Sequence, residues 1–428
     1  MLREASAALR ERDFRLLFFA RTASLLGSSF APVALAFAVL DDLDGSPTEL
    51  GIVLAAQWIP QILLTLVGGV WADRLPRNLV MVGTDLTMFA VQATVAILLL
   101  TGTAEIWHLL VLQAVRGSAD AFFWPAAAGL TPHVVSESRL QEANALLRLS
   151  NSMTRIVGAA AAGVVVAAVG SGWALAFDAT TFLVSAAFLV RLRLPRTLAA
   201  KAQDLVRELR EGWDEFRSRT WLWAIVLAAS FGNLGFVAVI VLGPAIADRD
   251  LGGAAAWGAI VSAEAVGFFL GGLLSLRIRP ERPLVAALLG ILLTGPFYAL
   301  LAVTAPLPVI MAAGVVAGVG IEVFGVLWDT ALQQHVPRDR LSRVAAWDQL
   351  GSFIVIPIGL TIVGPIADMI GLTEALLVFT AVVLVSNALA LLSRDVRTLR
   401  RVEVAAGPDA LPPRLHPQTD SVTETAVS

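Results

Sequence analysis

Long apolar runs, each about the length needed to cross a bilayer, dominate this sequence. A transmembrane helix needs about 20 mostly apolar residues. Division of the sequence at prolines, glycines and charged clusters gives twelve such runs: roughly 14–40, 49–71, 79–101, 107–132, 145–169, 173–191, 221–246, 255–276, 283–304, 307–333, 347–370 and 373–392. The chain is 57% hydrophobic and 15% charged, whereas soluble domains are about 45–50% apolar and about 25% charged. The sequence therefore predicts an all-α, multi-pass membrane protein with twelve transmembrane helices.

The connections between the runs differ in charge from one side to the other. The N-terminus, every second connection and the C-terminal tail carry arginines, whereas Arg249 is the only arginine in the opposite connections. Because cytoplasmic loops are enriched in Arg and Lys, both termini are predicted to be cytoplasmic. The first run is too long for a signal peptide, and further runs follow it.

The longest break between runs is basic and divides them into six and six. We therefore expect an N-terminal six-helix half (residues 1–190), a basic cytoplasmic linker (191–220) and a C-terminal six-helix half (221–392). The remaining segment, 393–428, contains a stretch rich in proline, serine and threonine, a composition typical of a disordered cytoplasmic tail.

The two halves also resemble each other in sequence. A shift of 201 residues aligns several pairs: Gly117 with Gly318, Gly158 with Gly359, Gly163 with Gly364, Gly170 with Gly371 and Leu140 with Leu341. A nearly constant offset through four helices is hard to explain by chance. Two halves in the same orientation imply a pseudo-twofold axis along the membrane normal.

A compact motif, "GGVWADRLPRN", fills the turn after the second run. Together with the six-plus-six arrangement and the basic linker, this turn resembles the loop motif of the major facilitator superfamily, G-x-x-x-D-R-x-x-R. Four residues match it position by position: Gly69, Asp73, Arg74 and Arg77. Pro76 replaces the usual glycine, and Asn78 replaces the last basic residue.

Three later stretches are similar to the twelve-helix drug and siderophore exporter branch of that family. They are "RGSADAFFWPA", "LQEANALLRL" and "FDATTFLVSAAF", and the resemblance extends over about residues 10–395. It implies the major facilitator fold and export by antiport. Ala159 stands where the branch often has the proline of an antiporter signature, which keeps import or uniport open as an alternative.

The family resemblance implies that the motif around Asp73 acts as a cytoplasmic gate. In that family the acid faces the start of helix 11 in the other half, here Val344–Gly351, and closes the cytoplasmic side when the cavity faces outward. Leu276 stands at the corresponding position of the second half, so the latch is one-sided. The alternative is that these turn residues are solvated and only fix the topology.

Charged side chains within the runs are the candidate transport site, because each costs at least about 2.5–3.5 kcal/mol at the bilayer centre. Arg116 and Asp120 share one face of the fourth run and are spaced to pair. Glu322 and Asp329 share a face of the tenth run, which is the repeat mate of the fourth. We therefore expect Asp120 and Glu322 on opposite walls of one cavity. The family resemblance places Arg21 there too.

Glu322 is the predicted proton carrier, because its own helix offers no nearby cation and a lone buried carboxyl group is suited to binding and releasing a proton. For Arg116 and Asp120 a structural salt bridge is the alternative. Asp85 and Asp178 lie nearer helix ends and are interpreted as structural, and the role of Glu264 stays open.

Aromatic side chains beside these charges predict a roomy apolar wall for the substrate, formed by Phe123, Trp124, Phe324 and Trp328. Ordinary helix packing is the alternative. The four histidines are too scattered for a metal set, and no nucleotide loop, nucleophile motif or cofactor motif stands out. Neither a metal, a cofactor nor an enzyme activity is therefore expected.

These features together predict a secondary active transporter of the cytoplasmic membrane. We expect a monomer that exports a small amphipathic compound by proton antiport, with the lipid bilayer, protons and the substrate as its partners and no nucleic acid among them. A proton-coupled importer or a uniporter is the nearest alternative. A receptor or scaffold that transports nothing is the alternative from another class, and it would need neither a gate motif nor acids facing one cavity.

Overall fold

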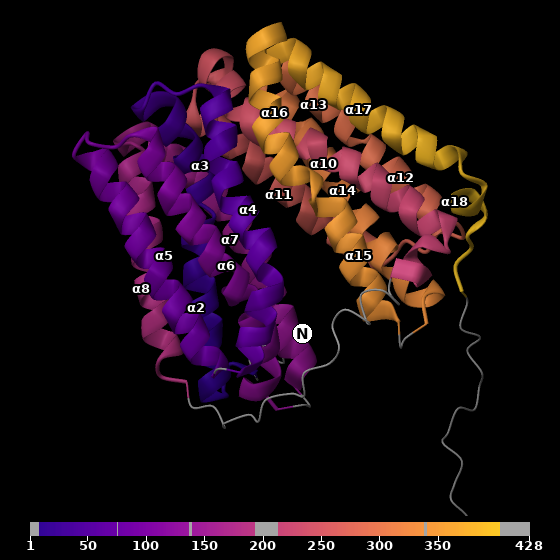
Figure 1. The fold of residues 1–428 in the computed structure, drawn as a ribbon, viewed down its shortest axis with the longest axis horizontal. Coiled ribbons are helices and arrows are strands. Elements are labelled where there is room, and N and C mark those ends of the chain that lie inside the picture. Colours follow the sequence, from indigo (N-terminus) through magenta and orange to yellow (C-terminus); the bar gives the residue numbers. More distant parts are fainter. Residues whose placement is uncertain (1–7, 75, 137–138, 193–212, 338–339, 403–428) are drawn as a thin grey trace, which may run out of the picture.

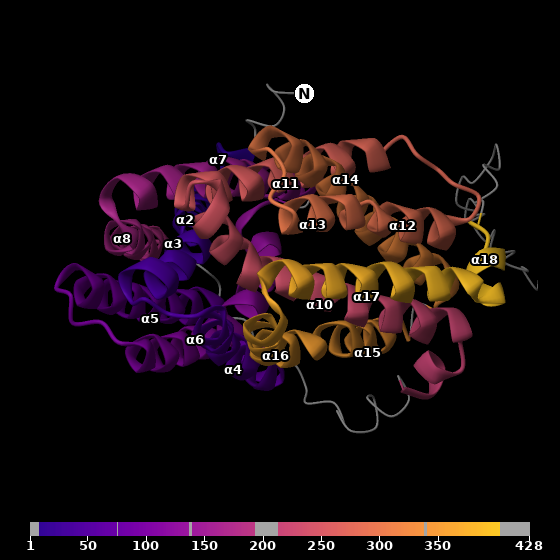
Figure 2. The ribbon, with the colours of Figure 1, turned by 90° about the horizontal axis from the view of Figure 1, so that it is seen from above.

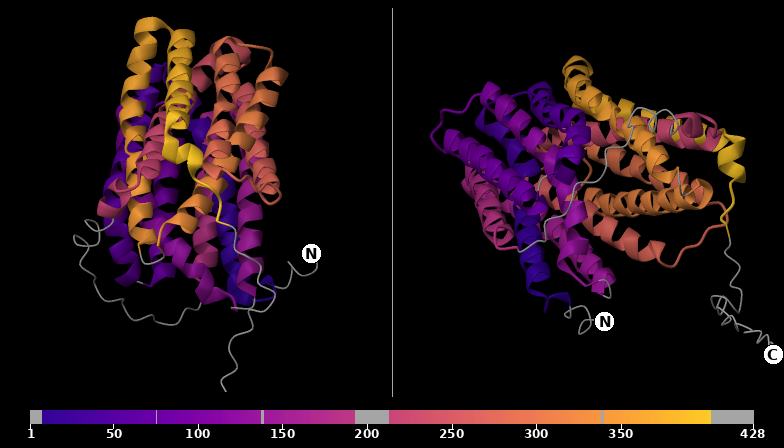
Figure 3. Two further views of the ribbon diagram at one scale, coloured as in Figure 1. Left: turned by 90° about the vertical axis from the view of Figure 1, so that its right-hand side faces the viewer. Right: turned by 60° about the horizontal axis from the view of Figure 1, so that its bottom comes forward.

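The computed structural model describes residues 8–74, 76–136, 139–192, 213–337 and 340–402, apart from the side chains of 66–74 and of several positions within 124–132 and 342–343. Within these residues the chain is helical and forms two bundles, one from each half of the sequence (Figure 1). Within each bundle the helices run roughly along one direction (Figure 3, left), and the two bundles are inclined to each other (Figure 1). The predicted all-α architecture is confirmed.

The N-terminal bundle contains the six predicted spans. Its elements are α2 (Arg12–Ser28), α3 (Ala31–Phe37) and the π-helical turn η1 (Ala38–Asp42), which together form the first span, followed by α4 (Pro47–Arg74), α5 (Arg77–Leu100), α6 (Ile106–Val134), α7 (Leu140–Val169) and α8 (Ser171–Leu189). The boundaries lie within a few residues of those expected from the apolar runs.

The C-terminal bundle repeats this order, with more interruptions. Its elements are α10 (Thr220–Ile246) with the π-helical turn η3 (Ala247–Leu251), α11 (Ala254–Ser275), α12 (Pro283–Leu292) with α13 (Thr294–Ala302), α14 (Leu307–His335), α15 (Leu341–Phe353) with α16 (Val355–Ile370), α17 (Leu372–Leu392) and the short α18 (Arg394–Thr398). α18 falls in the segment predicted to be a disordered tail. Residues 403–428 of that tail, and 193–212 of the linker, lie outside the described residues.

Eleven helical segments of the described chain are long and apolar enough to cross a membrane. The twelfth predicted span is α6, which is 29 residues long and carries Arg116 and Asp120 near its middle. A helix that places such charges at mid-depth must direct them toward other protein groups, because lipid offers no partners.

The sequence repeat appears in the structure as equivalent contacts. Gly170 and Gly371, aligned by the 201-residue shift, both have positive φ, 90° and 98°, between the last two spans of their halves. Positive φ is readily available to glycine, which has no Cβ. The same turn therefore precedes the last span of each half, and the chain is built of two six-helix repeats.

Two seams join the halves, and both lie at the same end of the molecule. Viewed from above, α7 lies beside α11 on one side and α4 beside α16 on the other (Figure 2). In the first seam Ser262 donates a hydrogen bond to the carbonyl oxygen of Ile156 at 2.7 Å. In the second, the Thr48 hydroxyl group donates one to the Asp368 carboxylate. We call this end of the molecule, which carries η1 and η3, the closed end.

Glycine permits the close approach at the α7–α11 seam. A Cβ built on Gly163 would lie only 2.5 Å from the carbonyl oxygen of Ala254 and 3.0 Å from the Cα of Gly258. Gly364, the repeat mate of Gly163, faces the backbone of Thr48 in the other seam in the same way. The repeat therefore supplies both seams from matching positions.

At the opposite end, which carries the α4–α5 turn, the two bundles separate (Figure 1). One hydrophobic cluster spans both halves at the closed end, joining residues such as Phe37 and Ala162 to Trp257 and Leu360. Away from it, each half keeps a cluster of its own, one around Phe14 and Leu130 and the other around Trp221 and Trp328. We call the end that carries the α4–α5 turn the open end.

Candidate functional site

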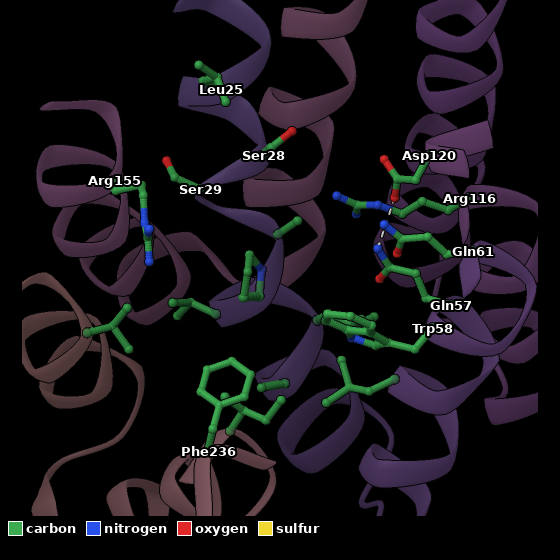
Figure 4. A pocket seen from close by; sticks show the side chains of 18 of the residues that line it. Leu25, Ser28, Ser29, Gln57, Trp58, Gln61, Arg116, Asp120, Arg155 and Phe236 are labelled. Carbon is green, nitrogen blue, oxygen red and sulfur yellow. Dashed lines mark hydrogen bonds between the residues drawn. The ribbon is translucent and has the colours of Figure 1, made fainter. Parts of the chain in front are cut away.

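A cavity of about 470 Å³ lies between the two bundles, on the open side of the seams. The N-terminal half contributes residues of α2, α3, α4, α5, α6, α7 and α8, and the C-terminal half contributes residues of α10, α11 and α13. Most of the lining is apolar or aromatic, including Trp58, Phe236 and Trp257. A few charged side chains interrupt it. Figure 4 shows Arg155 on one side of the cavity, with Arg116 and Asp120 on the opposite side.

Arg116 organises the charged part of the N-terminal wall. Its guanidinium group lies 4.0 Å from the carboxylate of Asp178 on α8, a residue with no exposed surface. Asp178 also accepts a hydrogen bond from Gln92 on α5. A buried ion pair stays stable only when further hydrogen bonds satisfy its partners, and Gln92 provides one of them.

Asp120 lies one turn along α6 from Arg116, which attracts it electrostatically. Its carboxylate accepts a hydrogen bond from the Gln57 amide on α4 at 3.1 Å. Asp120 and Gln57 both line the cavity (Figure 4). Arg116 therefore lies between a carboxylate buried in the protein and one that faces the cavity.

Asp85 of α5 is a second acid on this wall. It has no exposed surface, yet it belongs to the cavity lining. Neither of its carboxylate oxygens makes a hydrogen bond within 3.5 Å in the described part of the chain, although Ser185 lies nearby. An unsatisfied buried carboxyl group is costly, and such groups gather at functional sites.

The C-terminal wall has its own acid, Glu264 of α11, beside Tyr298 of α13. Arg155 of α7, which belongs to the other half, attracts the Glu264 carboxyl group electrostatically. The Arg155 side chain is exposed to the cavity, and its guanidinium carbon lies 5.0 Å from the centre of the Phe268 ring. Arg155 and Glu264 thus face each other across the α7–α11 seam.

The structure brings four of the predicted site residues into this cavity. Arg21, Arg116, Asp120 and Phe123 all line it. The expected proximity of Arg116 and Asp120 is present, but the ion pair within 4.0 Å joins Arg116 to Asp178, which the sequence analysis interpreted as structural.

Glu322 is placed differently from the prediction. No residue of α14 lines the cavity, and the Glu322 side chain packs against the glycines of α11 around Gly271. The reason is a slip of one residue in the repeat: the 201-residue shift aligns Asp120 with Ile321, so Glu322 is rotated by about 100° around its helix. The expectation that Asp120 and Glu322 form opposite walls of the cavity is wrong.

The other residues predicted on α14 also lie away from the cavity lining. Trp328 is buried in the core of its own half, where its indole N–H donates to Asp348 at 3.0 Å and its ring meets Trp221 edge-on. Phe324 packs against the same cluster. Asp329 is exposed and is attracted by Arg148. For Phe324 and Trp328 the alternative of ordinary helix packing is correct.

The gate motif falls largely outside what the structure describes at the level of side chains. The backbone of α4 continues through Gly69, Asp73 and Arg74, and Arg77 begins α5. The side chains of Asp73, Arg74 and Trp124, and the surroundings of Gly69, are not described. The turn lies at the open end, where the two halves are apart (Figure 1).

Arg155 is a charged residue of the cavity lining that was not predicted from the sequence. It lies near the middle of the fifth apolar run, so the rule that singled out Arg116 applies to it equally. The partner of Arg116 was not predictable in this way, because Asp178 is 62 residues away in the sequence and only the packing of α6 near α8 brings the two together.

The chain matches known transporters over most of its length. The family model described as Major Facilitator Superfamily matches residues 17–360. Macrolide efflux protein A of Streptococcus pyogenes is 22% identical over 84% of this chain and 91% of its own length. The multidrug efflux pump Tap of Mycolicibacterium fortuitum is 24% identical over 92% of this chain and 98% of its own.

A solved structure with the same fold is the bacterial homolog to the human lysosomal transporter Spinster, in an inward-facing and unoccupied conformation. It matches with a TM-score of 0.72 and 16% identity, covering 94% of this chain and all of that one. A bacterial homologue of the iron transporter ferroportin, in an inward-facing state, matches with a TM-score of 0.70 and 19% identity, covering 89% of this chain and 98% of that one.

Proposed function

Because this chain belongs to the Major Facilitator Superfamily, we propose that it is a secondary active exporter that moves a small amphipathic compound across the cytoplasmic membrane in exchange for protons. The observation that carries this proposal is the cavity between the halves, which is closed off by two seams at one end and faces the separated bundles at the other. Export is favoured because two relatives are named for efflux.

The cavity lining indicates the chemistry of the substrate. Small-molecule sites are mostly apolar, with a few polar groups that fix the orientation of the ligand. Here aromatic rings from both halves line the same cavity as Asp120 and Gln57, which are joined by a hydrogen bond. We infer a substrate with a large apolar surface and a group that donates hydrogen bonds or carries positive charge, which Asp120 would bind. Arg21 and Phe123 extend the same wall.

The arginine distribution gives the orientation. The connections at the open end contain nearly all of the loop arginines, whereas the closed end has Arg249. By the positive-inside rule we infer that the open end faces the cytoplasm. In this orientation the structure is the inward-facing state, with the cavity accessible to a cytoplasmic compound.

We assign the exchanged proton to Asp120, because it is the acid that both faces the cavity and lies within the attraction of Arg116. Substrate and proton then compete for one carboxylate, which links their movements. The energy is sufficient: one proton crossing ~150 mV releases roughly 3.5 kcal/mol. At about 1.4 kcal/mol per tenfold change, this supports a gradient of about 300-fold.

The test is transport by the purified protein in proteoliposomes, with ethidium and erythromycin as probes. A pH gradient should drive accumulation of at least one of them, and an uncoupler should abolish it. Asp120→Asn should lose this uphill transport. Asp329→Asn is the matched control, since Asp329 lies away from the cavity lining, and it should transport normally. If neither probe moves in response to the gradient, or if Asp329→Asn is the variant that loses coupling, the proposal is wrong in that respect.

A further inference from the structure

Arg155 and Glu264 are the two charged residues of the cavity that face each other from different halves of the molecule. Arg155 comes from α7 and Glu264 from α11, the helices that form the first seam. Ser262, two residues before Glu264 on α11, donates a hydrogen bond to the carbonyl oxygen of Ile156, the residue after Arg155 on α7. The two charges therefore lie directly beside a contact between the halves. Movement of one half against the other must change their separation.

Among the groups that pack around Glu264, Arg155 is the cation that attracts its carboxyl group. α14 presents glycines here, because a Cβ on Gly318 would lie 2.3 Å from the Glu264 carbonyl oxygen. α13 presents Tyr298, which is buried and neutral at ordinary pH. α7 presents Arg155, whose attraction also reaches Glu322 of α14, a residue that packs against Gly271 of α11. Arg155 therefore attracts a second carboxyl group besides Glu264, and the experiment must distinguish the two.

Arg155 is positioned by a contact that does not neutralise its positive charge. Its guanidinium group lies over Phe268, a cation–π arrangement that positions the group while leaving its N–H donors directed elsewhere. No ion pair within 4.0 Å joins Arg155 to another described residue, in contrast to Arg116 with Asp178. The charge of Arg155 is thus available to respond to Glu264.

We propose that Glu264 is a second proton-binding residue of this transporter, and that Arg155 is the positioning residue that converts its charge into closure of the α7–α11 seam. When Glu264 is ionised, the attraction across the seam favours the conformation seen here. When Glu264 is protonated, that attraction is lost, and separation of the seam costs less. The inference rests on the proposed function, because a proton matters here only if the two halves alternate.

The direction of the pH response follows from this attraction. The stabilisation exists only with ionised Glu264, so it is present at higher pH and is lost as the pH falls. Acidification should therefore shift the population toward the alternative state, in which the open end narrows. By linkage, the inward-facing state should release the Glu264 proton more readily than the other state does.

The experiment measures this equilibrium without any substrate. Spin labels are attached at Gln141→Cys, at the start of α7, and Leu276→Cys, just beyond the end of α11, both of them exposed at the open end. The chain has no native cysteine, so the labels report only these two sites. Electron–electron distance measurements in nanodiscs should show at least about a fivefold change in the ratio of long to short distances between mildly alkaline and mildly acidic buffer, a typical coupling.

Variants separate the roles of the two residues. Glu264→Gln should abolish the pH response and stay near the acidic distribution at every pH. Arg155→Gln should do the same, whereas Arg155→Lys should restore part of the response, because it retains the positive charge. Glu322→Gln is the matched control and should respond as the wild type does. A wild-type response in Glu264→Gln, or its loss in Glu322→Gln, overturns the assignment.

Failure of this inference is distinguishable from failure of the proposed function. Ethidium transport driven by a pH gradient is measured in parallel on the same variants. If ethidium and erythromycin are never transported but the distances still respond through Glu264, the proposed function fails and the switch stands as a conformational property. If wild-type transport is coupled to protons and Glu264→Gln keeps both coupling and the pH response, the inference fails and the function stands.

Discussion

Arg116 is the charged side chain around which the N-terminal wall of the cavity is organised, and its two acidic neighbours have different environments. Asp178 is fully buried, pairs with Arg116 and accepts from Gln92. Asp120 faces the cavity and accepts from Gln57. We infer that Asp178 keeps the arginine in place, while Asp120 remains available to ligands.

Replacement of each acid separates these roles. Asp178→Asn leaves Arg116 without its buried counter-ion, and breaking such a pair costs about 3–5 kcal/mol. Thermal unfolding followed by fluorescence-detected gel filtration should therefore show a large drop in melting temperature. Asp120→Asn is the matched control and should melt close to the wild type, because Arg116 retains Asp178. Equal melting temperatures for the two variants would show that the ion pair of Asp178 with Arg116 contributes little to stability.

Prediction from the sequence was least complete for the individual residues of the site. The rule that charges inside apolar runs are functional found Arg116 and Asp120, and applied to the fifth run it would have found Arg155. It also selected Glu322, whose helix does not line the cavity. A shift of one residue turns a side chain by about 100°, and the sequence repeat is too degenerate to fix the register that finely.

At the scale of elements, both halves have the same polar contact. Hydrogen bonds and ion pairs join the segment before the first helix of the half to the loop before its fifth helix. In the N-terminal half Glu11 accepts hydrogen bonds from the backbone and hydroxyl group of Ser136 and lies 3.4 Å from Arg139. In the C-terminal half Glu215 accepts from Arg219 and Arg340. The two clamps occupy matching places, because the repeat aligns Arg139 with Arg340.

The Glu215 clamp should be sensitive to acid. Its hydrogen bonds with Arg219 and Arg340 lower the pKa of Glu215. A lowered pKa means that the clamp contributes stability above the unfolded-state value of about 4.3, and that this stability is lost as the pH falls through the lower value of the folded protein. Glu215→Gln should mimic the acidic state at neutral pH.

Limited proteolysis checks this expectation. Cleavage within residues 193–219 should be several-fold faster in Glu215→Gln than in the wild type at neutral pH, since one end of the linker has lost its attachment. Asp214→Asn is the neighbouring control: its partner is Arg217 in a solvent-exposed pair, which contributes little. If both variants are cut at the wild-type rate, Glu215 does not anchor the linker.

The turn between α4 and α5 belongs to the same scale. If Asp73 forms a latch with the other half in the outward-facing state, Asp73→Asn removes that latch and shifts the population toward the conformation seen here. Turnover should fall more than expression does. Ser24→Cys, in the cavity lining, should then be labelled faster from the open end, with Asp13→Asn as a control at that end. Unchanged labelling would leave Asp73 as a solvated topology signal.

The elements themselves were well predicted, since helix limits in a bilayer are set by apolar length and by charge clusters. The breaks within spans were not. α12 and α13 are separated at Leu293, and α15 and α16 at Ile354, positions that hydropathy does not mark. Ser230 and Asn233 of α10 donate to the carbonyl groups of Gly351 and Ser352 beside the second break. These hydrogen bonds satisfy backbone carbonyl groups near the break. They come from a neighbouring helix and therefore depend on the tertiary fold.

At the scale of the whole molecule, the hydrophobic clusters show which end of the molecule is closed. A single hydrophobic cluster crosses the two halves at the closed end, while the open end has a separate cluster in each half. The repeat predicted the two halves and their relation, because every packing position is encoded twice. It did not predict which end is closed, because two conformations of one sequence can differ by only a few kcal/mol.

A covalent link at the closed end tests whether that end must open. Thr48 on α4 and Asp368 on α16 are in hydrogen-bond contact across the second seam. Thr48→Cys combined with Asp368→Cys should therefore cross-link readily, in a chain with no other cysteine. The linked protein is expected to bind ethidium from the open end with nearly wild-type affinity, because the cavity is unchanged. Its transport should fall at least tenfold and recover when the link is reduced. The two single-cysteine variants control for loss of the hydrogen bond. Undiminished transport by the linked protein would mean that the substrate leaves by a route that does not separate α4 from α16, and alternation about these seams would be wrong.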